Sequence, residues 1–260
     1  MNSLRELQRN WEGLAQADPL WAICTDPSKR DRQWTKEEFF ATGRKEIETV
    51  IDYAARVGLC IDKSRPALDF GCGVGRLTRA MAEYFPECCG LDISPTMIST
   101  AQELNRDRPH CHFQLNEDTR MKCLPDNYFG FIYTSLVLQH IAPPCSHQYI
   151  VELIRILNPD GVLIVQAPEK LCANSLTKVR TRLALRSRLQ SIFGTQPPYV
   201  MKMHCIKEAF IRKLMSQNGA RVVDVAITNS CDPAFSGNLR YLTQEPLHGY
   251  VSKQYCIVKH

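Results

Sequence analysis

Short apolar runs alternate with stretches of helical periodicity along most of the chain. The runs lie at residues 67–70, 88–92, 112–115, 131–134, 162–165, 221–227 and 255–258. Between them, apolar residues recur every three to four positions, as at Ile47, Val50, Ile51 and Ala54 before the first run. This alternation predicts an α/β fold, a doubly wound and mostly parallel sheet of seven strands with helices on both faces.

Capping and turn residues mark where several of these elements begin and end. Thr35 followed by Glu38 forms a capping box, which predicts that a helix is entered at Thr35. Gly58 ends a helix predicted from about residue 44, and Gly219 ends another predicted over residues 206–218. Asn158-Pro159-Asp160-Gly161 predicts a turn before the fifth strand.

The first strand runs directly into a glycine-rich turn. Gly71, Gly73 and Gly75 allow positive φ and a close approach of the backbone to a ligand, and the helix that follows offers free N–H groups to an anionic group. A dinucleotide loop would need glycine where this chain has Arg76, and the Gly-Lys-Ser/Thr of a Walker loop is absent. On the glycines alone, a cofactor loop and a loop that needs glycine only for packing both remain open.

An acid follows the second strand about 20 residues after the glycines. Doubly wound nucleotide-binding folds place a carboxylate there for the ribose hydroxyls, because a carboxylate accepts from both. Asp92 is predicted to have this role.

The order of Asp69, Gly71, Gly73 and Gly75 resembles the first motif of the class I S-adenosylmethionine-dependent methyltransferases, and residues 90–98 resemble their second motif. The resemblance covers residues 45–167 strongly and 205–258 in outline. It implies S-adenosylmethionine as cofactor and an antiparallel last strand.

The resemblance also implies a set of cofactor-binding residues. Glu117 and Asp118 remain alternatives for contact with the adenine amino group. For Cys72 two roles are open, and a small side chain that fills the turn is favoured over a nucleophile. The full set is Asp69, Phe70, Gly71, Cys72, Gly73, Gly75, Arg76, Asp92, Ile93, Met97, Asn116, Glu117, Asp118, Ser135 and Leu136.

Methyl transfer from a sulfonium needs alignment first, and a general base when the acceptor is an alcohol. Three residues are candidate bases: His140 after the fourth strand, His204 after the variable insert, and Glu169 after the fifth strand.

Residues 1–45 are predicted to form an N-terminal helical cap segment, and residues 46–260 a Rossmann-like methyltransferase domain with a basic insert at about 170–205. All three tryptophans lie in the cap, which is atypical of a disordered tail. A lid over the site and packing against the core are both open for it. Contacts with the substrate are expected from Trp21, Trp34, Phe39 and Tyr199.

The net charge of +5 is concentrated in one region. Residues 170–213 hold ten Lys or Arg and one acid, so the rest of the chain carries a net charge of −4. A solvated charged helix, a site for an anionic acceptor, and docking to RNA or membrane phosphate remain open for this insert.

Twelve cysteines are scattered without a Cys-x-x-Cys pair, so reduced thiols are expected and no metal site is predicted. Neither a run of about 20 apolar residues nor the apolar core of a signal peptide occurs, and the protein is expected to be cytoplasmic.

The sequence thus predicts a methyltransferase acting on an oxygen or nitrogen of a small-molecule or saccharide-type acceptor, possibly anionic in view of the insert. One alternative is an RNA methyltransferase, which the basic insert suggests. The other is a regulatory protein that binds the cofactor without turnover. Nucleic acid is the less favoured partner, and the oligomeric state is not predicted.

Overall fold

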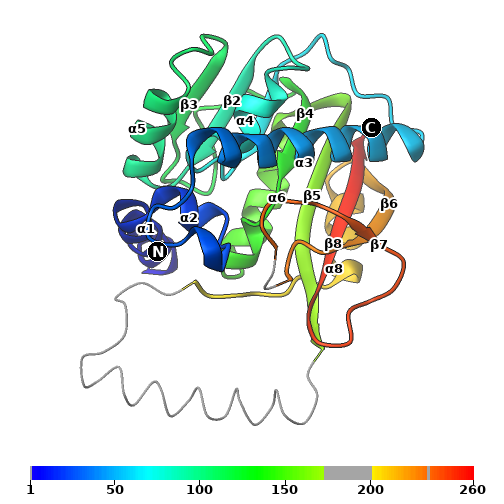
Figure 1. Cartoon of the computed structure of the whole chain (residues 1–260). Helices are drawn as coiled ribbons and strands as arrows, with labels where there is room; N and C mark the ends of the chain where they lie inside the picture. Colours follow the sequence, from blue (N-terminus) through cyan, green and yellow to red (C-terminus); the bar gives the residue numbers. More distant parts are fainter. Residues whose placement is uncertain (1, 173–200, 233–234) are drawn as a thin grey trace.

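The computed structural model describes residues 2–172, 201–232 and 235–260. Its centre is an eight-stranded sheet in the order β3-β2-β1-β4-β5-β8-β6-β7 (Figure 1). The strands are β1 Ala67–Phe70, β2 Cys88–Asp92, β3 Cys111–Leu115, β4 Phe129–Thr134, β5 Leu157–Cys172, β6 Ala220–Thr228, β7 Tyr241–Leu242 and β8 Gly249–Lys259. The predicted α/β fold is confirmed, with an eighth strand that the sequence analysis did not predict.

Strands β1 to β5 pair in parallel, whereas β8 is antiparallel to both of its neighbours, β5 and β6. The antiparallel last strand is therefore confirmed. The extra strand, β7, is two residues long and pairs with the end of β6. So short an element has no periodicity of its own that a sequence could reveal.

The predicted turn at residues 158–161 lies within β5. Leu157 pairs with Phe129, and the next paired residue, Val162, faces Phe131, so the register shifts where the turn was expected. Asp160 has a φ of 62° at this irregularity. The turn residues therefore form a bulge in a long strand, and β5 begins five residues earlier than predicted.

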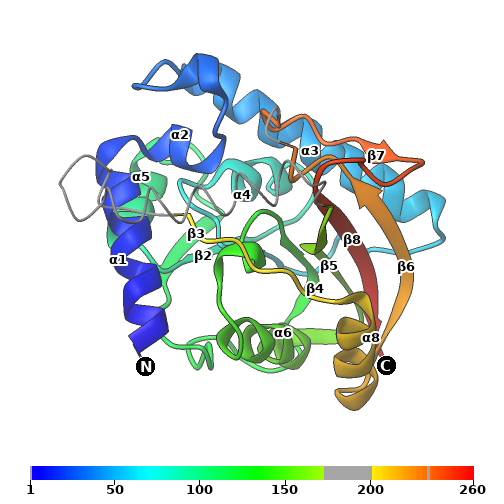
Figure 2. The same cartoon turned by 90° about the horizontal axis from the view of Figure 1, so that it is seen from below.

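Helices cover both faces of the sheet, and Figure 2 shows α3 and α4 on the opposite side from α6 and α8. The helices are α1 Asn2–Ala17, α2 Pro19–Ile23, α3 Lys36–Arg56, α4 Arg76–Met81, α5 Pro95–Leu104, α6 Cys145–Ile156 and α8 Glu208–Gln217, with 3-10 turns η1 Pro27–Lys29 and η2 Leu138–His140. One apolar core lies on each face, and a third joins the cap to the glycine turn and α5.

Helix α3 begins as predicted. Thr35 accepts from the backbone N–H of Glu38, and the Glu38 carboxylate accepts from that of Thr35. The helix then continues to Arg56 without a break, so the boundary expected at residue 45 lies inside it. A single rigid helix therefore joins the cap to the domain core.

Candidate functional site

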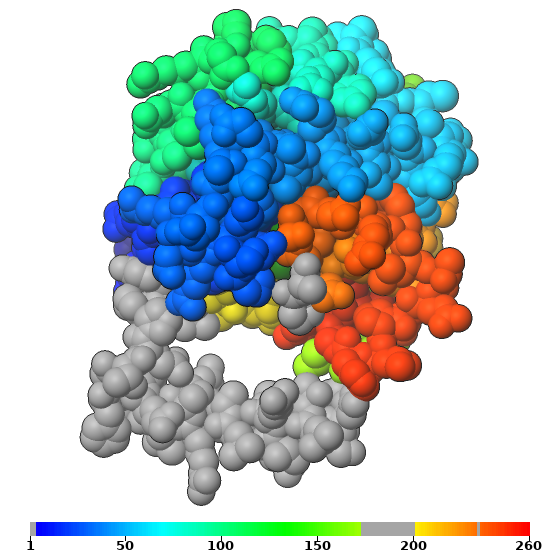
Figure 3. All heavy atoms as spheres, viewed as in Figure 1, coloured from blue at the N-terminus to red at the C-terminus, as the bar shows by residue number. Residues whose placement is uncertain are grey.

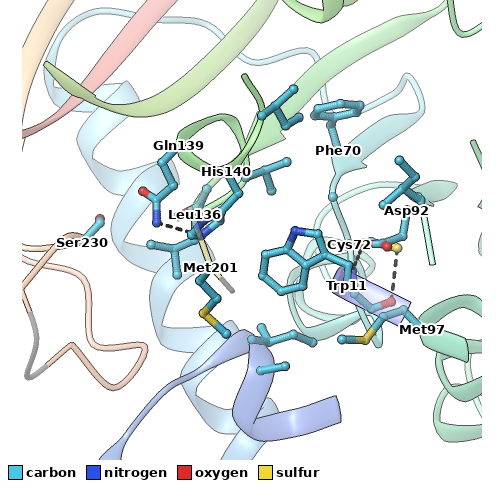
Figure 4. Close-up of a pocket in the computed structure, with 18 of the residues that line it drawn as sticks. Trp11, Phe70, Cys72, Asp92, Met97, Leu136, Gln139, His140, Met201 and Ser230 are labelled. Atoms are coloured by element: carbon cyan, nitrogen blue, oxygen red, sulfur yellow. Dashed lines mark hydrogen bonds between the residues drawn. The ribbon is translucent and has the colours of Figure 1, made fainter. Parts of the chain in front are cut away.

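A cavity of about 350 Å³ lies beyond the carboxyl ends of β1, β2 and β4 (Figure 4). Ligands of open α/β sheets bind at this edge, because the loops that follow the strands converge there. One of the candidate bases, His140, lines it, together with eleven of the predicted cofactor residues: Phe70, Gly71, Cys72, Gly73, Arg76, Asp92, Ile93, Met97, Asn116, Ser135 and Leu136.

The glycine turn has the conformation that its sequence predicts. Gly71, Gly73 and Gly75 have φ of 79°, 52° and 83°. A Cβ at Gly71 would lie 2.2 Å from Cγ2 of Val137, and one at Gly73 would lie 2.4 Å from Cδ1 of Ile23. Because no side chain fits there, the backbone of this turn is exposed to the cavity at close range.

Asp92 is fixed by the glycine turn itself. One carboxylate oxygen accepts from the Gly73 N–H at 2.9 Å, and the other accepts from the Ser94 N–H at 2.9 Å. Burial raises the pKa of Asp92, and these two N–H groups oppose the shift. The carboxylate is thus oriented in the cavity wall before a ligand binds, where its oxygens can accept from ribose hydroxyls.

Asp69, in contrast, does not line the cavity. It is fully buried, and one oxygen accepts from the N–H and the hydroxyl of Thr78 at 2.9 and 2.7 Å. Burial raises the pKa of Asp69 to about 7. The acid of the first motif therefore holds the start of α4 against β1, and neither Asp69 nor Gly75, which caps α4, lines the cavity.

Arg76 lines the cavity and is 2% exposed. Its Nη2 donates to the fully buried Glu46 on α3 at 2.8 Å, and the Tyr133 hydroxyl donates to the other Glu46 oxygen at 2.9 Å. The pair joins α3 to α4 beneath the glycine turn. A buried charge kept in this way requires its partner, because an uncompensated one costs several kcal/mol.

The two acids that follow β3 have their hydrogen-bond partners outside the cavity. Glu117 accepts from Nε2 of Gln8 on α1 at 2.6 Å, Asp118 accepts from the Arg120 N–H at 3.0 Å, and neither lines the cavity. Asn116 does line it, next to the Tyr149 hydroxyl at 3.5 Å. The amide therefore holds the position for which a carboxylate was expected.

The three candidate bases are in different surroundings. His140 lines the main cavity, and burial lowers its pKa. His204 lines an adjoining cavity of about 50 Å³ that Trp11 and His140 also line, and Glu169 forms an ion pair with Lys253 at 2.6 Å. Of the three candidate bases, His140 is the one that lines the main cavity.

Helix α1 covers the cavity, a role for which the sequence analysis had no residue. The Trp11 indole lies between the Asp92 end and the His140 end in Figure 4, with its ring centroid 5.2 Å from that of His140. Glu12 accepts from the hydroxyls of Ser94 and Thr96 and from the Thr96 N–H, so α1 caps the start of α5. The long-range pairing of an N-terminal helix leaves no local signal in the sequence.

The aromatic residues expected to contact the substrate pack within the cap. The Trp34 ring N–H donates to the Cys24 carbonyl at 3.1 Å, and that of Trp21 donates to the Asp26 carbonyl at 3.0 Å. Phe39 is fully buried against Trp34. None of these three lines the cavity, and Tyr199 lies outside the described residues, as does most of the basic insert.

The other end of the cavity is built from segments that carry no recognisable motif. Figure 3 shows the dark blue N-terminal residues next to the orange segment that follows β6 and the yellow segment after residue 200. The side chains there are apolar or uncharged apart from one acid: Ile23, Met201, Met203, Ser230, Cys231, Asp232, Phe235 and Tyr250. Their meeting depends on tertiary structure, which is why sequence reasoning missed them.

Neither a group of metal ligands nor a helix suited to cross a membrane is found in the part of the chain that the structure describes. Within the ranges given above, no three His, Cys, Asp or Glu side chains are grouped as metal ligands would be. None of the helices described is both long and apolar enough to cross a membrane.

Comparison with known proteins bears on the same part of the chain. Residues 68–165 match the family described as "Methyltransferase domain". A trans-aconitate 2-methyltransferase of Escherichia coli is 28% identical over 138 residues, which are 52% of this chain and 51% of that protein. One of Methylobacterium radiotolerans is 36% identical over 119 residues, 45% of this chain and 42% of that protein. The chain thus spans about half the length of the curated relatives it matches.

Solved structures share the fold over nearly the whole chain. Magnesium protoporphyrin IX methyltransferase from Synechocystis, with bound SAH, has a TM-score of 0.60 at 19% identity and covers 99% of this chain and 100% of its own. A putative sarcosine dimethylglycine methyltransferase from Galdieria sulphuraria also has a TM-score of 0.60, at 15% identity, over 92% and 95% of the two chains.

Proposed function

We propose that residues 68–165, which match the family described as "Methyltransferase domain", form a class I S-adenosylmethionine-dependent methyltransferase domain, and that the protein transfers a methyl group from this cofactor to an oxygen or nitrogen of a small-molecule acceptor. The observation that carries the proposal is the continuity of the cavity. It extends from Asp92 and the glycine turn, past His140, to a second end walled by Phe235 and Tyr250. Two molecules bound end to end would meet near Trp11 and His140.

The chain's own residues fit the cofactor. The exposed backbone of Gly71 and Gly73 suits the methionine part, Asp92 suits the ribose hydroxyls, and Asn116 suits the adenine edge. When bound, the cofactor supplies an activated methyl group on a sulfonium. The protein then has to align the acceptor with that methyl group and exclude water, which is what a cavity covered by α1 supports.

We propose that His140 is the general base that accepts a proton from the acceptor. Its ring lines the cavity, and its lowered pKa keeps the imidazole neutral near pH 7, the state in which it can accept a proton. The relatives named trans-aconitate 2-methyltransferase support a small-molecule acceptor. Acceptor identity is left to experiment.

The first experiment measures cofactor binding by titration calorimetry. We expect Asp92→Ala to lose charge-assisted hydrogen bonds of about 2–3 kcal/mol, which is a rise in Kd of roughly 30-fold or more. Asp92→Asn keeps the shape, and Asp52→Asn on the exposed side of α3 is the matched control. An unchanged Kd in both Asp92 variants would remove this residue from the cofactor site.

The second experiment identifies the acceptor. The protein is incubated with methyl-labelled cofactor and a cell extract separated into small molecules, glycans and RNA. Label in the small-molecule or glycan fraction is the expected outcome. Label in RNA alone would favour the alternative function, an RNA methyltransferase, which the basic insert suggested. Cofactor binding without any label would overturn the enzymatic function.

A further inference from the structure

A fully buried glutamine joins the two halves of the cavity wall. Gln166 on β5 is 1% exposed, and its Oε1 accepts from the backbone N–H of Leu136 at 2.8 Å. Its Nε2 donates to the Ser252 hydroxyl at 2.8 Å and to Oε1 of Gln139 at 3.4 Å. Because a backbone N–H can only donate, the contact with Leu136 fixes which end of the amide is oxygen.

The donor and acceptor ends of the Gln139 amide follow from those of Gln166. Its Oε1 receives the Gln166 N–H and the Cys231 thiol at 3.3 Å, so its Nε2 faces Nε2 of His140 at 3.2 Å (Figure 4). An amide N–H can only donate, so this ring nitrogen must accept. The other ring nitrogen, Nδ1, then carries the proton and donates to the Lys202 carbonyl at 2.8 Å.

Each hydrogen bond in this series is consistent with one protonation state of His140, the neutral ring with its proton on Nδ1. Protonation of His140 would place a ring N–H directly against the amide N–H of Gln139, with no acceptor between them. Other groups facing the ring are the Trp11 indole, which is uncharged, and His204, which contributes to lowering the pKa of His140. The Lys202 ammonium is turned to Glu6, with which it forms an ion pair at 2.6 Å.

We propose that Gln166 is a positioning residue which, by orienting the Gln139 amide, holds His140 in its neutral form with the proton on Nδ1. The inference deepens the proposed function, since it explains how a base in that cavity is kept unprotonated. It also sets a condition on the chemistry. The lone pair of His140 is engaged by Gln139, so His140 takes a proton from an acceptor only after the Gln139 amide turns away.

Gln166 has a second effect on the cofactor side. Leu136 has a φ of 63°, which is left-handed and unusual for a residue other than glycine, and it lines the cavity. The hydrogen bond from its N–H to Gln166 holds this conformation. One side chain therefore orients both the loop after β4 and the histidine four residues beyond Leu136.

The test is the pH titration of His140, followed by NMR in the full-length protein. In Gln166→Met the Gln139 oxygen loses the amide N–H that Gln166 donates to it, so the Gln139 amide can turn and present its oxygen to His140. We expect His140 to titrate at clearly higher pH than in the wild type. Gln139→Met removes the opposing N–H and should shift the titration in the same direction by less, which keeps the proposal testable should Gln166→Met fail to fold.

Gln254→Met is the matched control. Gln254 is a fully buried glutamine opposite Gln166 on β8, and it donates to the Tyr241 hydroxyl away from His140. If His140 titrates alike in the wild type, Gln166→Met and Gln254→Met, the proposal is overturned. Cofactor calorimetry on the same samples separates the two claims, because a wild type that binds no cofactor contradicts the proposed function and leaves the titration result standing.

Discussion

Gly43 is the residue at which α3 and α4 cross most closely, which makes Gly43→Ala a sharp test of how the site is supported. A Cβ at this position would lie 2.3 Å from the Arg76 carbonyl oxygen and 2.9 Å from the Arg76 Cγ. The first distance is about 1 Å shorter than van der Waals contact allows. The atom in the way is backbone, so α4 has to move.

The two effects of the substitution have opposite signs. Alanine in place of glycine inside a helix stabilises it by about 1 kcal/mol, whereas overpacking against a rigid neighbour costs about 1–3 kcal/mol and more when backbone must shift. We expect packing to prevail, with a net loss of about 2 kcal/mol and a fall in Tm of roughly 4–8 °C. Because Arg76 follows directly on the glycine turn, we also expect the Kd of the cofactor to rise by about tenfold or more.

Thermal unfolding and cofactor calorimetry measure the two outcomes. Ala41→Gly, on the exposed side of the same helix, is the control, since it changes helix propensity and meets no neighbour on α4. If propensity alone mattered, Gly43→Ala would be more stable than the wild type. A Tm equal to or above that of the wild type would refute the packing argument.

Three further predictions concern acids whose contacts the structure shows, Glu12, Asp69 and Glu169. Glu12→Ala removes the carboxylate that joins α1 to Ser94 and Thr96, so amide hydrogen exchange in α1 should accelerate and the cofactor should bind more weakly; unchanged exchange would mean that other contacts hold the helix. Asp69 has a folded-state pKa raised to about 7, above its unfolded value, so its neutral form favours folding at low pH and this stability is lost as pH rises through about 7. Asp69→Asn keeps an acceptor for Thr78, and between about pH 5 and pH 7 the variant should lose less stability than the wild type, by up to about 1.4 kcal/mol per pH unit in denaturant unfolding; parallel pH profiles would contradict this. Glu169→Gln breaks the ion pair with Lys253 and should lower Tm while leaving methyl transfer intact, and a loss of activity at unchanged Tm would restore Glu169 as a candidate base.

The sequence revealed the parts of the site that depend on local structure. Glycine at positions 71, 73 and 75 predicts positive φ values, because other residues avoid them. Asp92 is recognisable by its distance along the chain from those glycines. The capping box at Thr35 and the antiparallel last strand are further local or family-level signals, and both are confirmed.

The rest depended on contacts between segments far apart in the sequence. Trp11 reaches the cavity because α1 is held to α5, and Phe235 and Tyr250 reach it through the ends of β6 and β8. The partner of Asp69 could not be read from the sequence either, since a motif gives the position of a residue but not the direction of its side chain. Its carboxylate accepts from Thr78, and Asp69 does not line the cavity.

The position of β8 has a consequence for how the protein is made. It is the last strand along the chain, yet it lies between β5 and β6 and supplies Ser252 to the Gln166 amide. A chain growing from its N-terminus completes β1 to β6 first and has to keep the β5 edge and the β6 edge apart until residues 249–259 arrive. During that interval both edges are unpaired, which is the condition under which strands of different chains associate. Closure of the sheet therefore has to wait for residues 249–259, and chaperone binding during synthesis should be strongest just before that strand emerges.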